Sequence, residues 1–462
     1  MTLIKSISGI RGTIGGAQGE NLTPIDAVKY AAAYGAWIKQ QRDKSLHKIV
    51  VGRDARISGH MVQELVMQTL VGMGIHVVDL GLSTTPTVEV AVVLEKADGG
   101  IILTASHNPK QWNALKLLNN KGEFLNAEAG QEILNIAENG KIDFADVDAL
   151  GQITINDAYI DIHIEEILNL PLVNVEAIKK AKFKVVVDAV NSTGGIAVPL
   201  LLEALGVDPV KLYCTPNGQF PHNPEPLKEH LGDLMKLVVK EKADFGLVVD
   251  PDVDRLAFVD ENGDMFGEEY TLVAVADYIL QNTPGNTVSN MSSSRALRDV
   301  TNKYGCSYTA SAVGEVNVVD LMKETHAVIG GEGNGGIIYP ELHYGRDSLV
   351  GIALFLSYLA EINSSVSELR KGYPAYFASK NKIQLTPELD VEGILKAMEA
   401  KYSSEDINTI DGVKIDFEEK WVHLRKSNTE PIIRIYTEAK SQQAADDLAE
   451  RFINEIIEIS KS

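Results

Sequence analysis

HKIVVGRDARISG, at residues 47–59, contains the first copy of the unit from which most of this chain is built. Its apolar, β-branched start predicts a strand over 48–51, and the small and charged residues after it predict a loop. Helical periodicity over 59–73 and a second apolar strand over 76–80 follow. Strand, loop, helix and parallel strand in this order form a βαβ unit.

The same unit recurs at two later places. FKVVVDAVNSTGG at 183–195 precedes the helix IAVPLLLEALG, and NTVSNMSSS at 286–294 precedes the helix RALRDVTNKYG. Three copies predict three related α/β domains. Beyond residue 372 the pattern changes to short strands with two helices, which predicts an α+β domain. Its expected strands lie at 382–385, 412–417, 421–425 and 431–438, and its expected helices at 391–401 and 442–460.

The composition is that of a globular protein with a strong excess of acid. The 462 residues include 43 basic and 64 acidic side chains, giving a formal charge of −21. This charge repels nucleic acid and anionic membranes, so we expect neither as a partner. Cys214 and Cys306 have no metal-ligand spacing, which predicts free thiols in a reducing compartment. The sequence has no apolar run of signal-peptide or membrane-span length, and we expect a cytoplasmic protein.

A polar loop follows the apolar strand expected at 100–103. The loop reads TASHNP, and Lys116 lies a few residues beyond it. A parallel strand that ends in such a loop places its side chains at the carboxyl edge of the sheet, where α/β proteins bind ligands. The hydroxyl of Ser106, the imidazole of His107 and the ammonium of Lys116 are then available to a ligand. A plain polar turn with a helix N-cap is the alternative.

An acidic turn separates two apolar strands in DFGLVVDPDVDRLAFVD, residues 244–260. Asp250, Asp252 and Asp254 occupy alternate positions, which places three carboxylates on one face of an extended chain. Their mutual repulsion is relieved when a cation binds between them, and hard oxygen ligands suit magnesium. An EF-hand loop fails because Arg255 stands where its glycine is required. A solvated acidic turn and a haloacid-dehalogenase-type phosphatase with an aspartyl nucleophile stay open.

A glycine-rich stretch, GEGNGG at 331–336, matches the spacing of a dinucleotide-binding fingerprint. That fingerprint must open a helix, yet the apolar residues that follow here continue as a strand, so we reject it. What remains is a flexible loop that presents Glu332 and Asn334. A carboxylate and an amide suit neighbouring sugar hydroxyls, and a plain hairpin turn is the alternative.

Two more stretches are suited to phosphate. SGIRGTIGG at 8–16 presents Arg11 among glycines that let the backbone approach a ligand closely. RKSNTEP at 425–431 gathers a guanidinium, hydroxyls, an amide and backbone N–H groups, which together suit a phosphate dianion. The second stretch also has the composition of ordinary turns.

TASHNP, DPDVDR, GEGNGG and RKSNTEP stand in an order and spacing that resembles the α-D-phosphohexomutase superfamily over essentially the whole chain. GEGNGG looks more like the archaeal-type branch than the Ser-Gly-His ending of many bacterial members. Pro251 and Val253 also replace residues that are often small in the family. The resemblance implies three α/β domains with mixed sheets around a central cleft, and a C-terminal α+β domain. We expect these domains over 1–152, 153–265, 266–372 and 373–462, carrying in turn the phosphoserine, metal, sugar and phosphate loops.

By resemblance, this enzyme is an isomerase that interconverts hexose 6-phosphate and hexose 1-phosphate through a phosphoserine and a bisphosphorylated sugar. Ser106 is the implied phosphoserine. The implied metal ligands are Ser106, Asp250, Asp252 and Asp254, and the other implied catalytic residues are His107, Lys116, Arg11 and Arg255. The implied substrate-binding residues are Glu332, Asn334, Arg425, Ser427, Asn428 and Thr429.

The resemblance implies Mg²⁺ and a hexose 1,6-bisphosphate activator as cofactors. Among hexose phosphates we favour glucosamine phosphate, because SGIRGTIGG resembles the start of phosphoglucosamine mutases and Glu332 can pair with a 2-ammonium group. Glucose and mannose phosphates, the substrates of phosphoglucomutases and phosphomannomutases, stay open. So does a non-catalytic sugar-phosphate sensor, and the protein is expected to be a monomer or a dimer.

Overall fold

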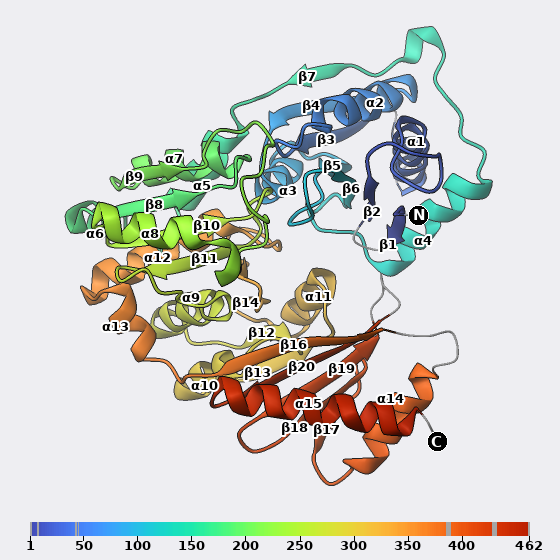
Figure 1. Cartoon of the computed structure of the whole chain (residues 1–462). Helices are drawn as coiled ribbons and strands as arrows, with labels where there is room; N and C mark the ends of the chain where they lie inside the picture. The colour runs from blue at the N-terminus through green and yellow to red at the C-terminus, as the bar shows by residue number, and fades with distance from the viewer. Residues whose placement is uncertain are drawn as a thin grey trace.

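Four β-sheets follow one another along the chain in the computed structural model, which describes residues 2–6, 9–41, 44, 46–384, 390–426 and 432–460. Figure 1 shows the first sheet at the top and the fourth at the bottom, with the second and third between them on the left. Each sheet has helices beside it, so the described part of the chain is built from α/β layers.

The first sheet has the strand order β1-β2-β6-β5-β3-β4-β7. Its strands are β1 (Ile4–Ser6), β2 (Gly9–Thr13), β3 (His47–Arg53), β4 (Ile75–Leu82), β5 (Gly99–Leu103), β6 (Trp112–Leu118) and β7 (Ile153–Ile155). Its helices are α1 (Pro24–Gln41), α2 (Gly59–Gly72), α3 (Thr85–Leu94) and α4 (Ala127–Asn139). Strand β7 pairs with β4 and extends this sheet beyond residue 152, where the first domain was expected to end.

The second and third sheets have the orders β11-β10-β8-β9 and β13-β12-β14-β15. The second comprises β8 (Lys184–Asp188), β9 (Asp208–Leu212), β10 (Phe245–Val249) and β11 (Leu256–Asp260), with α5 (Tyr159–Leu168), α6 (Val175–Ala181), α7 (Gly194–Ala204) and α8 (Gly232–Glu241). The third comprises β12 (Thr287–Asn290), β13 (Tyr308–Ser311), β14 (Ile329–Glu332) and β15 (Gly336–Ile338). Its helices are α9 (Glu268–Asn282), α10 (Ala296–Lys303), α11 (Glu315–Thr325), α12 (Ser348–Ile362) and α13 (Val366–Lys371).

One arrangement of strands is common to the first three sheets. Three parallel strands lie side by side, and an antiparallel strand is added at one edge by a hairpin. The hairpins are β5–β6, β10–β11 and β14–β15, and each joins the third strand of its unit to the fourth. This repeated mixed topology confirms the predicted fold class of three related α/β domains.

The fourth sheet is antiparallel throughout, in the order β16-β20-β19-β18-β17. It contains β16 (Phe377–Gln384), β17 (Asp406–Asn408), β18 (Val413–Asp416), β19 (Trp421–Lys426) and β20 (Ile432–Ala439), with α14 (Val391–Lys401) and α15 (Gln442–Ile459). Figure 1 shows α15 lying along one face of these strands. The α+β prediction is confirmed, although the short, polar β17 was not expected.

A single hydrophobic core joins the second and third sheets. It includes residues from Ile160 to Tyr373, whereas the first and fourth sheets have cores of their own. Helix α12 explains the fusion, because SLVGIALFLSYLAEI is apolar on nearly every side and such a helix must be surrounded by protein. Asp347 caps its first turn by accepting hydrogen bonds from the backbone of Leu349 and Val350. None of the described helices is long and apolar enough to cross a membrane.

Candidate active site

The three loops singled out in the sequence occupy equivalent places in the fold. TASHNP follows β5, DPDVDR joins β10 to β11, and GEGNGG contains the turn between β14 and β15. Each loop therefore lies at the hairpin of its repeat, at the carboxyl end of the third parallel strand. Ligands of α/β folds bind at this edge of the sheet.

The TASHNP loop is held from inside by a buried arginine. Arg56 donates to the backbone carbonyls of Ser106, Asn108, Pro109 and Trp112, while its Nε donates to Asp54 at 2.9 Å. Ser106 has a left-handed backbone with φ of +48°. This conformation is unfavourable for a residue other than glycine, so the surrounding hydrogen bonds must hold it. They direct the Ser106 side chain toward the second sheet.

The acidic loop is similarly constrained. Asp250 Oδ1 accepts hydrogen bonds at 3.1 Å from the backbone N–H groups of Asp254 and Arg255. Val253 has φ of +65°, an unfavourable conformation for a β-branched residue. The carbonyl of Pro251 accepts hydrogen bonds from two hydroxyls, those of Ser192 and Thr193. Local strain is thus stored in both loops at the point where they meet.

Ser106 and the three aspartates form one buried centre. The Ser106 hydroxyl donates to Asp250 Oδ2 at 2.9 Å, which joins the first sheet to the second. One carboxylate oxygen from each of Asp250, Asp252 and Asp254 lies within 4.8 Å of the others, and all three side chains are fully buried. Oδ1 of Asp252 and Oδ1 of Asp254 have no hydrogen-bond partner. Buried carboxylate oxygens without donors fit the ligands of a hard divalent cation.

The charges in this centre are strongly perturbed. Burial, and then the charges of Asp254 and Asp252, raise the pKa of Asp250 well above its ordinary value. Burial also opposes the charge on Asp254, but Arg346 and Lys116 outweigh it and lower the pKa of that carboxyl. Such competition between buried carboxylates is typical of a functional site that needs positive charge.

Lys116 supplies part of that positive charge from β6. Its Nζ lies 2.7 Å from Asp252 Oδ2 and 3.4 Å from Asp254 Oδ2. Burial disfavours the ammonium, but these two carboxylates outweigh burial and raise the pKa of Lys116. Lys116 is therefore protonated in this state, and the β5–β6 hairpin brings it into contact with the acidic loop.

Glu332 of the glycine-rich loop is connected to the acidic loop by an arginine that the sequence analysis did not single out. Arg346 donates to Glu332 Oε2 at 2.9 Å, to Asp254 Oδ2 at 2.7 Å and to Glu315 Oε2 at 2.9 Å. The second oxygen of Glu332 accepts from Asn290 Nδ2 at 2.8 Å. The sequence signal available for Arg346 was its position in an Arg-Asp pair directly before an apolar helix.

The remaining predicted residues are placed as follows. Burial, and then the charge of Arg255, hold the pKa of His107 well below its ordinary value, and His107 Nδ1 lies 3.4 Å from the Ser106 hydroxyl. Arg11 also acts on His107, and its own buried Nε has no hydrogen-bond partner. Asn334 turns back onto its own loop, accepting from the Gly336 backbone at 3.2 Å.

The predicted distal phosphate loop is described only at its start. Arg425 lies in β19 and pairs with Asp411 at 3.2 Å; none of its described contacts is with the acidic loop. Ser427, Asn428 and Thr429 lie outside the described residues.

A second residue that the sequence analysis missed is Thr85, at the start of α3. Its hydroxyl donates a hydrogen bond to Asp252 Oδ2 at 2.6 Å.

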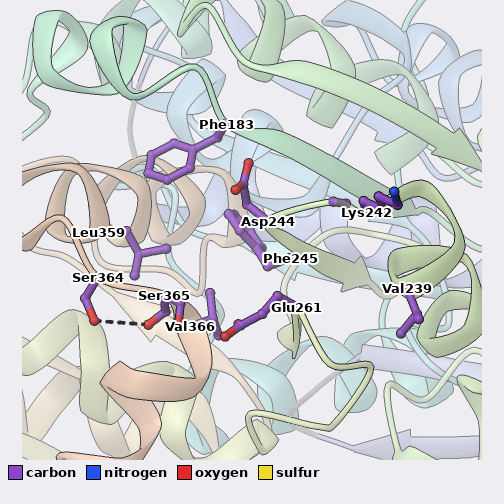
Figure 2. A pocket seen from close by; sticks show the side chains of 11 residues that line it. Phe183, Val239, Lys242, Asp244, Phe245, Glu261, Leu359, Ser364, Ser365 and Val366 are labelled. Atoms are coloured by element: carbon purple, nitrogen blue, oxygen red, sulfur yellow. Dashed lines mark hydrogen bonds between the residues drawn. The ribbon is translucent and has the colours of Figure 1, made fainter.

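A separate cavity of about 390 Å³ lies at the opposite edge of the second sheet. Figure 2 shows its lining side chains, among them Asp244 and Phe245 at the start of β10 and Glu261 after the end of β11. Asp250 follows the other end of β10. The cavity is therefore not part of the centre around Ser106.

Gly335 of the glycine-rich loop packs closely against Leu256, which directly follows the acidic loop, and this contact can be tested by mutation. It has φ of +86°, and a Cβ here would lie 2.1 Å from the carbonyl oxygen of Leu256. We expect Gly335→Ala to lower the melting temperature, because overpacking of this kind costs about 1–3 kcal/mol. Gly305→Ala is the matched control, since Gly305 has φ of +69° and no atom within 4 Å of an added Cβ. Equal melting temperatures in the two variants would contradict the close contact.

Comparison with known proteins gives the same family throughout the chain. Models of phosphoglucomutase/phosphomannomutase match as alpha/beta/alpha domain I at residues 3–143, domain II at 161–263, domain III at 267–376 and the C-terminal domain at 361–455.

Individual relatives agree over nearly their full lengths. A phosphoglucomutase/phosphomannomutase of Thermococcus kodakarensis is 37% identical over 450 residues, 95% of this chain and 96% of that protein. A phosphoglucosamine/phosphogalactosamine mutase of Sulfurisphaera tokodaii is 33% identical over 462 residues, with 98% and 97% covered. The crystal structure of a family member from Burkholderia thailandensis gives a TM-score of 0.84 at 26% identity, covering 99% of this chain and 98% of that one. The chain therefore belongs to the phosphoglucomutase/phosphomannomutase family, the α-D-phosphohexomutases, and is a hexose-phosphate mutase, an isomerase.

Proposed function

We propose that this mutase carries its phosphoryl group on Ser106 and acts on glucosamine phosphate. The observation that carries the first part is the 2.9 Å hydrogen bond from the Ser106 hydroxyl to Asp250, at the edge of a three-aspartate cluster. A phosphate on Ser106 then lies beside those carboxylates. Asp250, Asp252 and Asp254 would hold Mg²⁺ there, and the ion would supply positive charge to the transferring phosphoryl.

In the proposed reaction, phospho-Ser106 gives its phosphoryl to a free hydroxyl of a bound hexose monophosphate. The bond from phosphorus to Ser106 Oγ breaks as a bond to the sugar oxygen forms, and the sugar hydroxyl loses its proton. Lys116 is already protonated, so it steadies negative charge, whereas the neutral imidazole of His107 can take the proton from the sugar hydroxyl. His107 Nδ1 lies 3.4 Å from Ser106 Oγ, so it can return this proton to the Ser106 oxygen that leaves the phosphorus. The resulting bisphosphate turns around and returns its other phosphoryl to Ser106, which makes a hexose 1,6-bisphosphate the activator.

Guanidinium groups surround the proposed path of the phosphoryl. The charges of Arg255, Arg346 and Arg11 all act on His107, so they lie close enough to stabilise added negative charge. Burial, and then the charge of Arg434 in β20, lower the pKa of Arg11, which indicates that the fourth sheet approaches this point. An incoming phosphate dianion compensates this repulsion between like charges.

The preference for an amino sugar is supported by Glu332 and by relatives. Glu332 is only 6% exposed and is held by Arg346 and Asn290 from two sides, which fixes its carboxylate for a 2-ammonium group. The relatives include probable phosphoglucosamine mutases, such as one of Methanopyrus kandleri that is 32% identical. Glucose and mannose phosphates are the alternative, favoured by the Thermococcus kodakarensis relative named above.

A coupled assay decides the sugar. The enzyme is supplied with Mg²⁺ and with glucosamine, glucose or mannose 6-phosphate, each primed with the matching 1,6-bisphosphate, and formation of the 1-phosphate is followed. We expect the highest kcat/KM with glucosamine 6-phosphate. A higher value with glucose or mannose phosphate would overturn the sugar assignment while leaving the mutase activity intact.

We also propose that Arg425 binds the phosphate that is not being transferred, together with Ser427, Asn428 and Thr429. Because that contact is present in the ground state and the transition state alike, Arg425→Ala should mainly raise KM. A hydrogen bond to a charged group contributes about 1.5–3 kcal/mol, so we expect a rise of about tenfold or more. Arg451→Ala, at an exposed position of α15, is the control and should leave KM unchanged. A loss confined to kcat would show that Arg425 has another role.

The domain division at 1–152, 153–265, 266–372 and 373–462 is likewise a proposal, supported by one sheet per segment and qualified by β7, which belongs to the first sheet. We further propose a cytoplasmic location, in keeping with Cys214 and Cys306, which form no disulfide.

A further inference from the structure

A second buried cluster of polar side chains lies between the elements that support the acidic loop. His163 comes from α5, His343 and Asp347 come from the segment between β15 and α12, and Glu89 comes from α3. His163 and Asp347 are fully buried, Glu89 is 1% exposed, and the His343 side chain is 7% exposed. None of the proposed catalytic steps uses any of these four residues.

Both imidazoles direct the same nitrogen at one carboxylate oxygen. His163 Nε2 lies 3.0 Å and His343 Nε2 lies 3.3 Å from Asp347 Oδ2. Asp347 Oδ1 is already occupied by the backbone N–H groups at the start of α12. One ligand atom from each of the three residues lies within 4.8 Å of the other two, and the separations of 3.0 and 3.3 Å match the edges of a coordination shell with bonds of about 2.0–2.2 Å.

The opposite nitrogens have partners of the kind that orient metal-binding histidines. His163 Nδ1 lies 2.9 Å from the hydroxyl of Thr87, and His343 Nδ1 lies 3.3 Å from Glu89 Oε2. A histidine that binds a metal usually donates its other N–H to a carboxylate or another oxygen acceptor. A Cβ at Gly345 would lie 1.9 Å from Glu89 Oε2, so glycine there is what lets the carboxylate sit so close to the backbone.

Glu89 is the observation that points to a ligand. Neither of its two buried oxygens completes a hydrogen bond, and neither does His343 Nδ1. With a neutral His343 protonated on Nε2, the bare Nδ1 would face the Glu89 carboxylate with no proton between them. With a cation on Nε2, the proton stays on Nδ1 and satisfies Glu89, and both imidazoles remain neutral.

Charge balance points the same way. Burial raises the pKa of Glu89 to about 8, and the two buried carboxylates, Asp347 and Glu89, are stabilised in their charged forms by positive charges nearby. A divalent cation supplies them in one place. The competing occupant is a proton: burial lowers the pKa of His343, but Asp347 and Glu89 outweigh burial and raise it to about 10.

We propose that His163, His343 and Asp347 bind a divalent transition-metal ion of the zinc type, with Glu89 orienting His343. Two imidazoles and one carboxylate suit such an ion better than Mg²⁺, which prefers oxygen ligands and suits the acidic loop instead. Three protein ligands leave a further position for water. This inference goes beyond the proposed function and does not depend on it.

The bound ion stabilises the two helices that hold the acidic loop in place. Helix α3, which carries Glu89, donates from the Thr85 backbone to the carbonyl of Asp252 at 2.8 Å. Helix α12, which Asp347 caps, donates from the Ser348 backbone to the carbonyl of Val253 at 3.1 Å. Through Glu89 and Asp347, the ion therefore connects α3 of the first sheet with α12 of the common core. These are the two helices that donate hydrogen bonds to the acidic loop.

The test uses the full-length protein, stripped with a chelator and titrated with Co²⁺ in saturating Mg²⁺. Visible d–d absorption reports cobalt bound by imidazole, and displacement by Zn²⁺ reports the preferred ion. We expect the wild type to show the absorption band and His343→Gln to lose it. Glu89→Gln keeps all three ligands and should weaken Co²⁺ binding by about 10–100-fold, the usual effect of removing an orienting partner.

Two controls locate the ion. His222→Gln should bind Co²⁺ like the wild type, since His222 has the same 3.0 Å contact with an aspartate, Asp188, but no second imidazole. Asp252→Asn should also keep the band, because it changes none of the three proposed ligands and leaves Glu89 in place. The proposal is overturned if the wild type shows no band, if His343→Gln or Glu89→Gln, verified as folded by circular dichroism, binds Co²⁺ like the wild type, or if Asp252→Asn loses the band. Absence of a wild-type band would mean that the cluster holds only protons.

Discussion

Turnover by the Ser106→Ala variant is expected to fall by about four orders of magnitude or more, because losing a covalent nucleophile removes the reaction path and not merely a contact. The fold should survive. The lost hydroxyl makes a hydrogen bond to Asp250 at 2.9 Å and a longer one to His107 at 3.4 Å, and a bond of this kind contributes about 0.5–1.5 kcal/mol. The melting temperature and circular dichroism spectrum should therefore change little while kcat collapses. Retention of a tenth of wild-type activity would exclude Ser106 as the phosphoryl carrier.

Ser58→Ala is the matched control for this variant. Ser58 lies in the loop before α2 of the same sheet, where its hydroxyl contacts Asn113 at 3.0 Å and none of the three aspartates. Its removal should leave kcat within a few-fold of the wild type.

A chemical test then locates the phosphoryl group directly. After labelling with radioactive bisphosphate, the label should survive hydroxylamine at neutral pH and map to the peptide with Ser106. A label that hydroxylamine removes, or that maps to the Asp250 peptide, would indicate an acyl phosphate instead.

The Asp252→Asn variant is expected to lose nearly all activity and to bind Mg²⁺ more weakly. An amide keeps the shape of the side chain but removes one negative charge from a site that needs oxygen anions. It also weakens the 2.7 Å ion pair with Lys116 and alters the contact with Thr85. Isothermal titration with Mg²⁺ and measurement of kcat against Mg²⁺ concentration separate weaker binding from slower chemistry.

Asp264→Asn is the matched control for the loss of charge. Asp264 is exposed and lies in the turn after β11, outside the three-aspartate cluster. It should bind Mg²⁺ and turn over substrate like the wild type. Unchanged Mg²⁺ affinity in Asp252→Asn would refute the metal assignment.

The acidic loop and the glycine-rich turn were predictable because their structure is local. In both, apolar strands flank a short turn. For the glycine-rich stretch the hairpin turn was the alternative to a flexible loop, and β14 and β15 do form an antiparallel pair. The strand β6 was harder, because Asn113 and Lys116 interrupt the apolar pattern of a strand. It forms because it pairs with β2 on one side and β5 on the other, and such pairings are not visible in a short window.

Arg346 and Thr85 could not be predicted because their roles depend on contacts between distant segments. Arg346 meets Asp254 from 92 positions away, and Thr85 meets Asp252 from 167 positions away. The same holds for the cluster of His163, His343 and Asp347, in which isolated residues gain meaning only when α5 and α12 pack together. A lone histidine in a sequence carries no such information.

The common core of the second and third sheets determines which parts of the active site can move. Interfaces that are large and hydrophobic resist relative motion, whereas smaller ones permit it. The acidic loop after β10 and the glycine-rich loop after β14 are therefore held at a fixed separation by this common core. In the proposed reaction, the sugar presents first one end and then the other to Ser106. We expect the first and fourth sheets to make the adjustments that admit it, since they have hydrophobic cores of their own. The second and third sheets thus form the rigid part of the enzyme, and the first and fourth sheets form its movable parts.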